Sequence, residues 1–292
     1  MRGSRPSITA ENTAAVRAFD AMQPPDRQVC HDVYARYFLS DRFTARADPA
    51  DAISRTLHQW EKIVPGVCGA ILARTCFVDE CLSRAVNNRI EQLVILGAGY
   101  DTRALRFPSL QHKVKVYELD HPATQQYKLE RLKRSCPDLA NRVIYIPINF
   151  EKNHFGRALI SHGYDRSKYT FYIWEGVSYY LPARVVDDTL FFIAGNCATG
   201  SEIVFDYFPA SVVRGTCELP EARPLVRILS QFGEKIRFGI SPEKIAGFLH
   251  KRGYTIVRNL SGADCRQAYF QGKAGMDVTV SDLFYFAHAK VT

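Results

Sequence analysis

A glycine-rich turn between a buried strand and a helix constrains this chain more than any other feature. The segment QLVILGAGYDTRALR begins with the apolar run 92–96, breaks at Gly97-Ala98-Gly99 and continues into a helix start. Such a turn brings backbone N–H groups and the positive end of a helix close to a ligand. Tight structural turns also use paired glycines, so the turn alone is a weak signal.

Acidic residues end the next predicted strand. The run VKVYELD, about twenty residues after the turn, ends in Glu118 and Asp120, which is the usual place for an acid that binds ribose hydroxyls. Glycines and acid in one strand–helix–strand unit predict a site for a cofactor that contains a nucleoside.

The residues after the glycines favour S-adenosylmethionine (SAM) over a dinucleotide. The dinucleotide fingerprint needs a third glycine or alanine, but this chain has Thr102 there, preceded by Asp101. A carboxylate repels a pyrophosphate in a confined site, whereas the amino group and sulfonium of SAM tolerate an acid. NAD stays open as the alternative.

Composition indicates an ordinary globular protein. The 292 residues are 47% hydrophobic and 23% charged, and the net charge of +8 is scattered, so nucleic-acid binding is not required. The eight cysteines form no C-x-x-C pair or zinc-like spacing, which predicts free thiols and no metal site. An apolar signal core and membrane-length runs are missing, so we expect a cytoplasmic protein with no membrane partner.

Helical patterns come first along the chain and an alternating pattern follows. Apolar spacing predicts helices over 12–22, 27–39, 53–63 and 69–86. From residue 92, five apolar strands alternate with helices such as 124–134 and 182–196, which indicates a parallel sheet covered on both faces. The five strands are QLVIL, VKVYELD, VIYIPINF, TFYIWEGVSYYL and SEIVFDYF.

The last part of the chain predicts a helical insertion and two closing strands. Helical patterns around 220–232 and 242–250 precede the strands YTIVRNL and DLFYFAHAKV. We therefore expect one α/β domain, with a seven-stranded and mostly parallel sheet that ends in an antiparallel pair. Within it we expect a helical cap over 1–90, a cofactor-binding core over 91–208, a helical lid or substrate insertion over 209–251 and closing strands over 252–292.

Six motifs in this order resemble the leucine carboxyl methyltransferase family, which includes bacterial O-methyltransferases of unassigned or natural-product substrate. They span residues 73–208 and read ARTCFVDECL, VILGAGYDTRALR, YELDHPATQQYKLERL, INFEKN, WEGVSYYL and FDYF. The resemblance implies a class I, Rossmann-like methyltransferase fold and SAM as cofactor, with S-adenosylhomocysteine (SAH) as product. It does not identify the methyl acceptor.

The resemblance assigns cofactor roles to several residues. Arg74 matches the arginine that holds the carboxylate of the methionine moiety, a task that suits a guanidinium; without the resemblance it would be taken for a surface arginine. Gly97 and Gly99 let the backbone approach the methionine end of SAM. Asp120 matches the acid that binds the ribose, and Glu118 is kept as a second candidate.

Two further cofactor contacts come from the segment INFEKN. Asn149 and Phe150 fall where the family usually has an aspartate and an apolar residue against adenine. An asparagine still accepts a hydrogen bond from the adenine amine through its amide oxygen, but without charge assistance.

Glu175 matches the family glutamate beside the cofactor, facing the substrate pocket. Tyr179 and Tyr180 offer aromatic walls and hydroxyl donors, or else belong to the core. Asp206, at the end of the fifth strand, is another pocket candidate. No histidine pairs with a carboxylate at a defined spacing, so no general base is assigned.

These features together predict a SAM-dependent O-methyltransferase. A carboxylate acceptor is favoured, in a small molecule or a peptide C-terminus, because a carboxylate is ionised at neutral pH and needs no base. A phenol or alcohol of a natural-product pathway is the first alternative. An NAD(P)-dependent oxidoreductase and a SAM-binding protein without catalysis are the others.

Overall fold

A seven-stranded sheet forms the centre of the protein in the computed structural model, which describes residues 5–44, 48–111, 113–271 and 278–292. The strand order is β3-β2-β1-β4-β5-β7-β6, and only β7 runs antiparallel to its neighbours. This is the class I methyltransferase sheet expected from the sequence. Its strands are β1 (Gln92–Leu96), β2 (Lys115–Asp120), β3 (Ile144–Pro147), β4 (Thr170–Trp174), β5 (Glu202–Tyr207), β6 (Tyr254–Leu260) and β7 (Tyr285–Val291).

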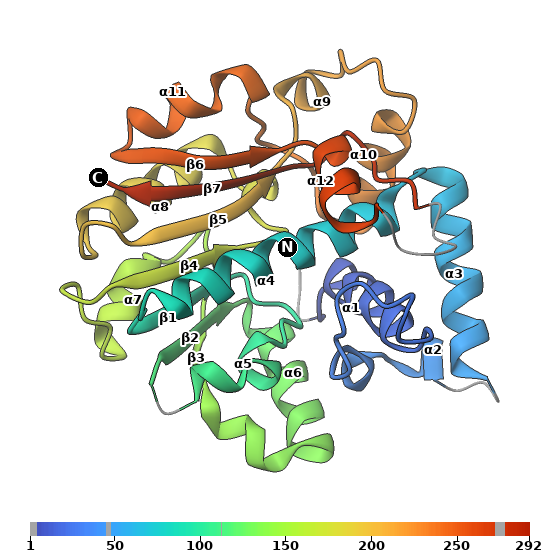
Figure 1. Ribbon diagram of the computed structural model, residues 1–292, viewed down its shortest axis with the longest axis horizontal. Helices are drawn as coiled ribbons and strands as arrows, with labels where there is room; N and C mark the ends of the chain where they lie inside the picture. Colours follow the sequence, from blue (N-terminus) through green and yellow to red (C-terminus); the bar gives the residue numbers. More distant parts are fainter. Residues whose placement is uncertain (1–4, 45–47, 112, 272–277) are drawn as a thin grey trace.

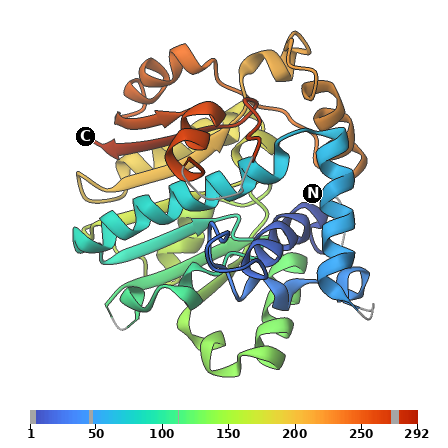
Figure 2. The same ribbon diagram turned by 45° about the vertical axis from the view of Figure 1, so that its right-hand side comes forward.

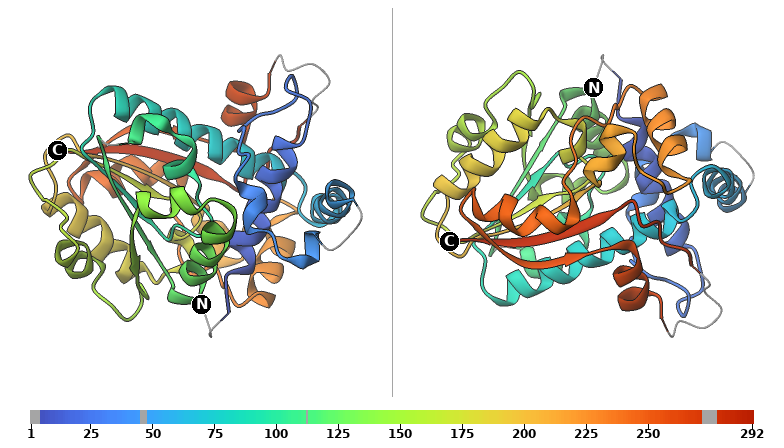
Figure 3. Two further views of the ribbon diagram at one scale, coloured as in Figure 1. Left: turned by 90° about the horizontal axis from the view of Figure 1, so that it is seen from below. Right: turned by 90° about the horizontal axis from the view of Figure 1, so that it is seen from above.

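Helices cover both faces of the sheet, as the continuous apolar strands require. On one face, α4 (Val67–Asn87) crosses β4, β5 and β7, with α6 (Pro122–Ser135) on the same side and α12 (Gly262–Tyr269) against α4. On the other face lie α7 (Phe155–Ser161), α8 (Ala183–Gly195) and α11 (Ile245–His250). Figure 3 shows these two helical layers on opposite sides of the strands.

Five further helices gather at the carboxyl ends of the parallel strands, where ligands bind in open α/β sheets. Figures 1 and 2 show α1, α3 and α10 beyond that edge. They belong to the N-terminal part and to the insertion after β5. The helices there are α1 (Ile8–Ala21), α2 (Asp41–Thr44), α3 (Pro49–Ile63), α9 (Ala210–Arg214) and α10 (Ala222–Gln231).

The helix predicted over 27–39 is wrong. Only the short 3₁₀ turn η1 (Ala35–Phe38) forms there. The Asp20 carboxylate accepts the N–H groups of Val29 and Cys30, both at 2.9 Å, and buried Asp32 accepts that of Ala35 at 3.1 Å. Carboxylates thus satisfy backbone donors that a helix would have used.

Several strands end earlier than their apolar runs. β3 ends at Pro147 rather than at residue 150, and β4 ends at Trp174 rather than at residue 181. After β4 the chain turns at Gly176, with φ +73°, and forms the 3₁₀ turn η4 (Ser178–Tyr180). These early ends release Asn149, Glu175 and the tyrosines from the sheet, so that they can line a cavity.

Candidate active site

The glycine turn after β1 has the left-handed backbone that only glycine adopts easily. Gly97 has φ +71° and Gly99 has φ +50°. A Cβ atom on Gly97 would lie 2.3 Å from Val177 Cγ2. The helix that follows, α5 (Arg103–Arg106), has only four residues. The turn itself, rather than a long helix, therefore presents backbone to the cavity.

Asp120 lies beside this turn at the end of β2. Its carboxylate is buried and accepts the backbone N–H groups of Gly99 and His121. Burial raises the pKa of Asp120 to about 6, although these two N–H donors oppose the shift. The sequence placed Asp120 with the glycines, and the fold brings them into hydrogen-bond contact.

Glu118 lies apart from the cavity. Its carboxylate pairs with Lys128 Nζ of α6 at 2.6 Å, and both side chains are almost fully buried. The same ammonium donates to the Asp101 carbonyl oxygen at 2.6 Å. Lys128 thus connects α6 to both β2 and the glycine turn, and Glu118 is not among the residues that line the cavity.

Arg74, in the middle of α4, joins two strand ends. Its Nε donates to Glu175 Oε1 at 3.0 Å and its Nη1 to Asp206 Oδ2 at 2.7 Å. The other Asp206 oxygen accepts the Gly176 N–H at 2.7 Å. Neither ion pair uses Nη2, which leaves this nitrogen for a ligand.

A second buried arginine, Arg103, forms an ion pair with the other carboxylate oxygen of Glu175. Arg103 Nη1 lies 2.8 Å from Glu175 Oε2, and its Nε donates to Asp79 at 2.7 Å. It also pairs with Asp101. Burial opposes ionisation of Glu175, but Arg103 and Arg74 outweigh it and lower its pKa to about 2. Glu175 is therefore ionised at neutral pH, paired with two arginines, and a poor proton acceptor.

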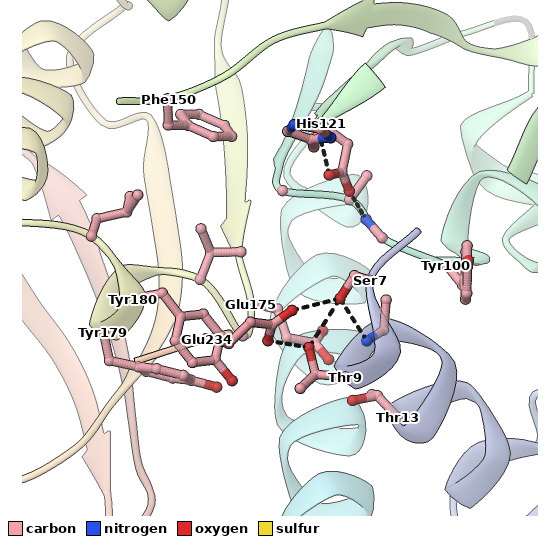
Figure 4. Close-up of a pocket in the computed structure, with 18 of the residues that line it drawn as sticks. Ser7, Thr9, Thr13, Tyr100, His121, Phe150, Glu175, Tyr179, Tyr180 and Glu234 are labelled. Carbon is pink, nitrogen blue, oxygen red and sulfur yellow. Dashed lines mark hydrogen bonds between the residues drawn. The ribbon is translucent and has the colours of Figure 1, made fainter. Parts of the chain in front are cut away.

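The expected adenine contacts lie in the loop after β3. Asn149 Oδ1 accepts the Glu151 N–H at 3.0 Å, and the Asn149 N–H donates to Asn153 Oδ1 at 3.2 Å. The amide oxygen would have to be shared with an adenine amine. Phe150 lies across the cavity from His121 (Figure 4).

These residues line one cavity of about 1020 Å³, at the upper end of the usual range for ligand sites. It brings together most of the residues predicted from the sequence, but neither Glu118 nor Asp206 lines it. The predicted residues that line it are Arg74, Gly97, Gly99, Asp120, Asn149, Phe150, Glu175, Tyr179 and Tyr180.

The end of the cavity near Tyr179 contains residues that the sequence did not suggest. Glu234, after α10, accepts hydrogen bonds from Ser7 Oγ at 2.9 Å and from Thr9 Oγ1. Figure 4 shows this cluster beside Tyr179 and Tyr180. No local motif marks Ser7, Thr9 or Glu234, because segments more than 220 residues apart meet here.

The two tyrosines at this end are neutral donors. Burial raises the pKa of Tyr179 and of Tyr180 well above the usual value. The Tyr179 hydroxyl lies 3.5 Å from Arg74 Nη1. Among the described residues, no group of three or more His, Cys, Asp or Glu is placed to hold a metal ion.

Known proteins resemble this chain in sequence and fold. A model of the leucine carboxyl methyltransferase family matches residues 10–194. The Bacillus subtilis protein YktD, named as a candidate SAM-dependent methyltransferase, is 28% identical over 75% of this chain and 71% of its own length. A Mycobacterium tuberculosis protein of the same description is 31% identical over 61% of this chain and 58% of its own length.

Solved structures share the fold at low identity. A candidate methyltransferase from Thermobifida fusca superposes with a TM-score of 0.60 at 15% identity, over 99% of this chain and 96% of that one. A DUF574 family protein from Streptomyces avermitilis has a TM-score of 0.59 at 14% identity, over 91% and 99%. Within the described residues, no helix is long and apolar enough to span a membrane. The family match covers more than half of the chain, which therefore belongs to the leucine carboxyl methyltransferase family of SAM-dependent enzymes.

Proposed function

We propose that this protein transfers the methyl group of SAM to an oxygen atom of a small acceptor, and that this oxygen belongs to a carboxylate. The observation that carries the proposal is the set of donors at one end of the cavity. Two neutral tyrosine hydroxyls line this end, and the Tyr179 hydroxyl lies beside Arg74. Hydrogen-bond donors of this kind hold an acceptor carboxylate without needing to change protonation state.

The cofactor would occupy the other end of the cavity. The Gly97–Gly99 backbone and Asp120 suit the ribose and the methionine chain, and Asn149 with Phe150 suits adenine. Arg74 Nη2 and the ionised Glu175 suit the carboxylate and ammonium of the methionine moiety. When bound, SAM supplies a methyl group on a sulfonium, which is a strong electrophile.

The protein then has to align one oxygen behind that methyl group and exclude water. A carboxylate oxygen attacks with its own electron pair, the methyl–sulfur bond breaks, and SAH leaves with a methyl ester as the second product. No proton moves. Consistent with this chemistry, Glu175 is ionised and hydrogen-bonded, so the residue beside the reaction is an electrostatic partner rather than a base.

A hydroxyl acceptor is the second candidate, and Glu234 favours it. This carboxylate is 6% exposed, lines the cavity near Tyr180 and has no cationic partner within ion-pair distance in the described part of the chain. It could take the proton of a phenol or alcohol, while the oxygen lone pair attacks the methyl group. A carboxylate acceptor would instead have to tolerate the Glu234 charge.

Radiolabelled methyl transfer to benzoate and to phenol tests the proposal. A methyl ester releases labelled methanol in alkali, whereas a methyl ether does not. Transfer to benzoate that alkali releases supports the carboxylate reaction, and it should survive Glu234→Gln. Transfer to phenol that falls about 100-fold or more in Glu234→Gln supports the hydroxyl reaction. Label on a nitrogen or carbon acceptor alone would contradict both.

The state of the cysteines bears on the cellular location of the protein. Cys30, Cys68, Cys81, Cys136, Cys197, Cys217 and Cys265 are free thiols, which is the expected state in a reducing compartment. We therefore infer a cytoplasmic site of action on small molecules.

A further inference from the structure

We propose that an apolar pocket beside the cofactor cavity is the subsite for one compact apolar group of the methyl acceptor, either a branched alkyl chain or a single ring. This inference rests on the proposed methyl transfer and goes further by naming the part of the acceptor that gives specificity. The pocket lies between α3, α4 and α10.

The walls of this pocket are almost entirely hydrocarbon. α10 contributes Ile228 and Leu229, α4 contributes Ile71, and Trp60 of α3 and Phe208 after β5 complete the walls. Arg74 is the only charged side chain among the described residues that line it, and both its ion pairs are made with strand-end carboxylates. A charged or sugar-like group would lose its hydration here without new partners, so the pocket selects apolar groups.

The pocket adjoins the cofactor cavity at the end where transfer is proposed. The same five residues line both spaces, and they are Thr9, Thr13, Arg74, Tyr179 and Tyr180. All five carry a polar atom, whereas the deeper walls carry almost none. An acceptor that places its apolar group in the pocket therefore leaves its oxygen among these polar atoms, facing the cofactor.

The volume limits the size of the group. The pocket measures about 100 Å³. A dry cavity of about 150 Å³ lined by Leu, Ile and Phe accepts one benzene molecule. The pocket therefore admits an isobutyl or isopropyl group, or one ring if a side chain moves slightly, and it excludes fused rings.

Apolar burial sets the expected affinity differences. Each buried methylene strengthens binding about four-fold. Isovalerate carries three more carbons than acetate, so it should bind at least 10-fold more tightly even if one of the three stays partly exposed. The same preference should appear whether the reacting group is a carboxylate or a hydroxyl, because the pocket contacts the other end of the molecule.

Calorimetry on the full-length protein saturated with SAH tests the subsite. The probes are acetate, isovalerate, benzoate and naphthoate, each titrated separately. We expect isovalerate and benzoate to bind at least 10-fold more tightly than acetate, and naphthoate to bind no better than acetate. Equal affinity for all four probes, or tightest binding of naphthoate, would overturn the subsite.

Variants of α10 make the test specific to this pocket. Leu229→Phe fills the pocket and should remove the preference for isovalerate over acetate. Arg227→Phe adds the same ring at an exposed position of the same helix and should keep that preference. If Leu229→Phe does not fold, Ile228→Phe replaces it, and unchanged SAH affinity shows that the variant is intact.

The two proposals fail in different ways. If the wild-type protein does not bind SAH, the methyltransferase proposal fails before any probe is added. If SAH binds but Leu229→Phe and Ile228→Phe keep the preference for isovalerate, only the subsite fails.

Discussion

The two ends of the cavity are built in different ways. The cofactor end is charged and comes from strand ends and the turns that follow them, so each of its motifs is a short continuous segment. The acceptor end is mostly apolar and combines α1, α10 and η4, which lie far apart in the chain. Arg74 belongs to both ends.

This contrast separates the residues that set cofactor affinity from those that select the methyl acceptor. The cofactor end depends on buried ion pairs, which are costly to break because a lone buried charge has no compensation. The acceptor end depends on shape and apolar area, where side chains can be exchanged at lower cost. Changes at the first end should therefore affect stability and cofactor affinity, and changes at the second should affect the choice of acceptor.

The largest effect is expected for Arg74→Met. It leaves the carboxylates of Glu175 and Asp206 buried without one of their cations, so we expect a loss of about 3–5 kcal/mol in the free energy of unfolding. Urea denaturation measures this. Arg55→Met, in an exposed pair with Asp51, is the matched control and should cost less than about 1 kcal/mol. Equal losses in both variants would remove the special role given to Arg74.

A smaller effect is expected for Asp120→Asn. Loss of a charged hydrogen-bond acceptor should weaken SAH binding by about 1.5–3 kcal/mol, which calorimetry measures. Glu118→Gln, two residues earlier on β2, changes a carboxylate that lies outside the cavity. It should not weaken SAH binding by a comparable amount. If Glu118→Gln weakens SAH more than Asp120→Asn does, the ribose assignment is reversed.

Cofactor affinity should also depend on pH. The pKa of Asp120 is raised to about 6, so the carboxyl group becomes protonated below that pH when no ligand is bound. SAH binding through the carboxylate should then weaken by up to about tenfold for each pH unit below 6. Asp120→Asn should flatten this dependence between pH 4.5 and 6. A wild-type profile that is flat in that range would contradict the assignment.

Low pH should affect stability in the opposite direction from cofactor affinity, because protonation of Asp120 favours the folded protein. Its folded pKa lies above the ordinary value of 3.8, so its contribution is fully present below about pH 3.8 and is lost as the pH rises through about 6. In the free protein, Asp120→Asn should therefore remove a penalty at neutral pH. Urea denaturation at pH 5 and pH 7.5 measures the difference.

The smallest effect is expected at the acceptor end. Ile228 is half-buried on α10, and Ile228→Ala should cost about 1 kcal/mol of stability. SAH affinity should stay unchanged, because no charge is altered. The larger pocket should relax the limit on acceptor size, seen as improved naphthoate binding relative to wild type. A clear loss of SAH affinity would show that the two ends are coupled.

Sequence patterns could group the residues of the proposed cofactor end, because these residues follow single strands. Gly97, Gly99 and Asp120 could be placed together, since neighbouring parallel strands end at the same edge of the sheet. Glu118 shows the limit of that reasoning. Strand position suggested a second cavity residue, but a lysine from α6 pairs with it in the core.

The prediction of a helix over 27–39 was wrong for a related reason. Apolar spacing there fits a helix, yet the chain is held by Asp20 and by Asp32, which also pairs with Arg17 of α1 at 2.8 Å. Helical periodicity reports only which side chains are buried. It does not report that nearby carboxylates will satisfy the backbone donors.

The sequence by itself determined the sheet, the glycine turn, the family and the cofactor, because each depends on residues that are close together in the chain or repeat with the period of a strand. Only the tertiary structure decided which residues lie at the proposed acceptor end. Ser7 bonds Glu234, and Trp60 and Leu229 line the same pocket, across long stretches of chain. Such contacts leave no periodic pattern, because they arise where separately formed elements pack together.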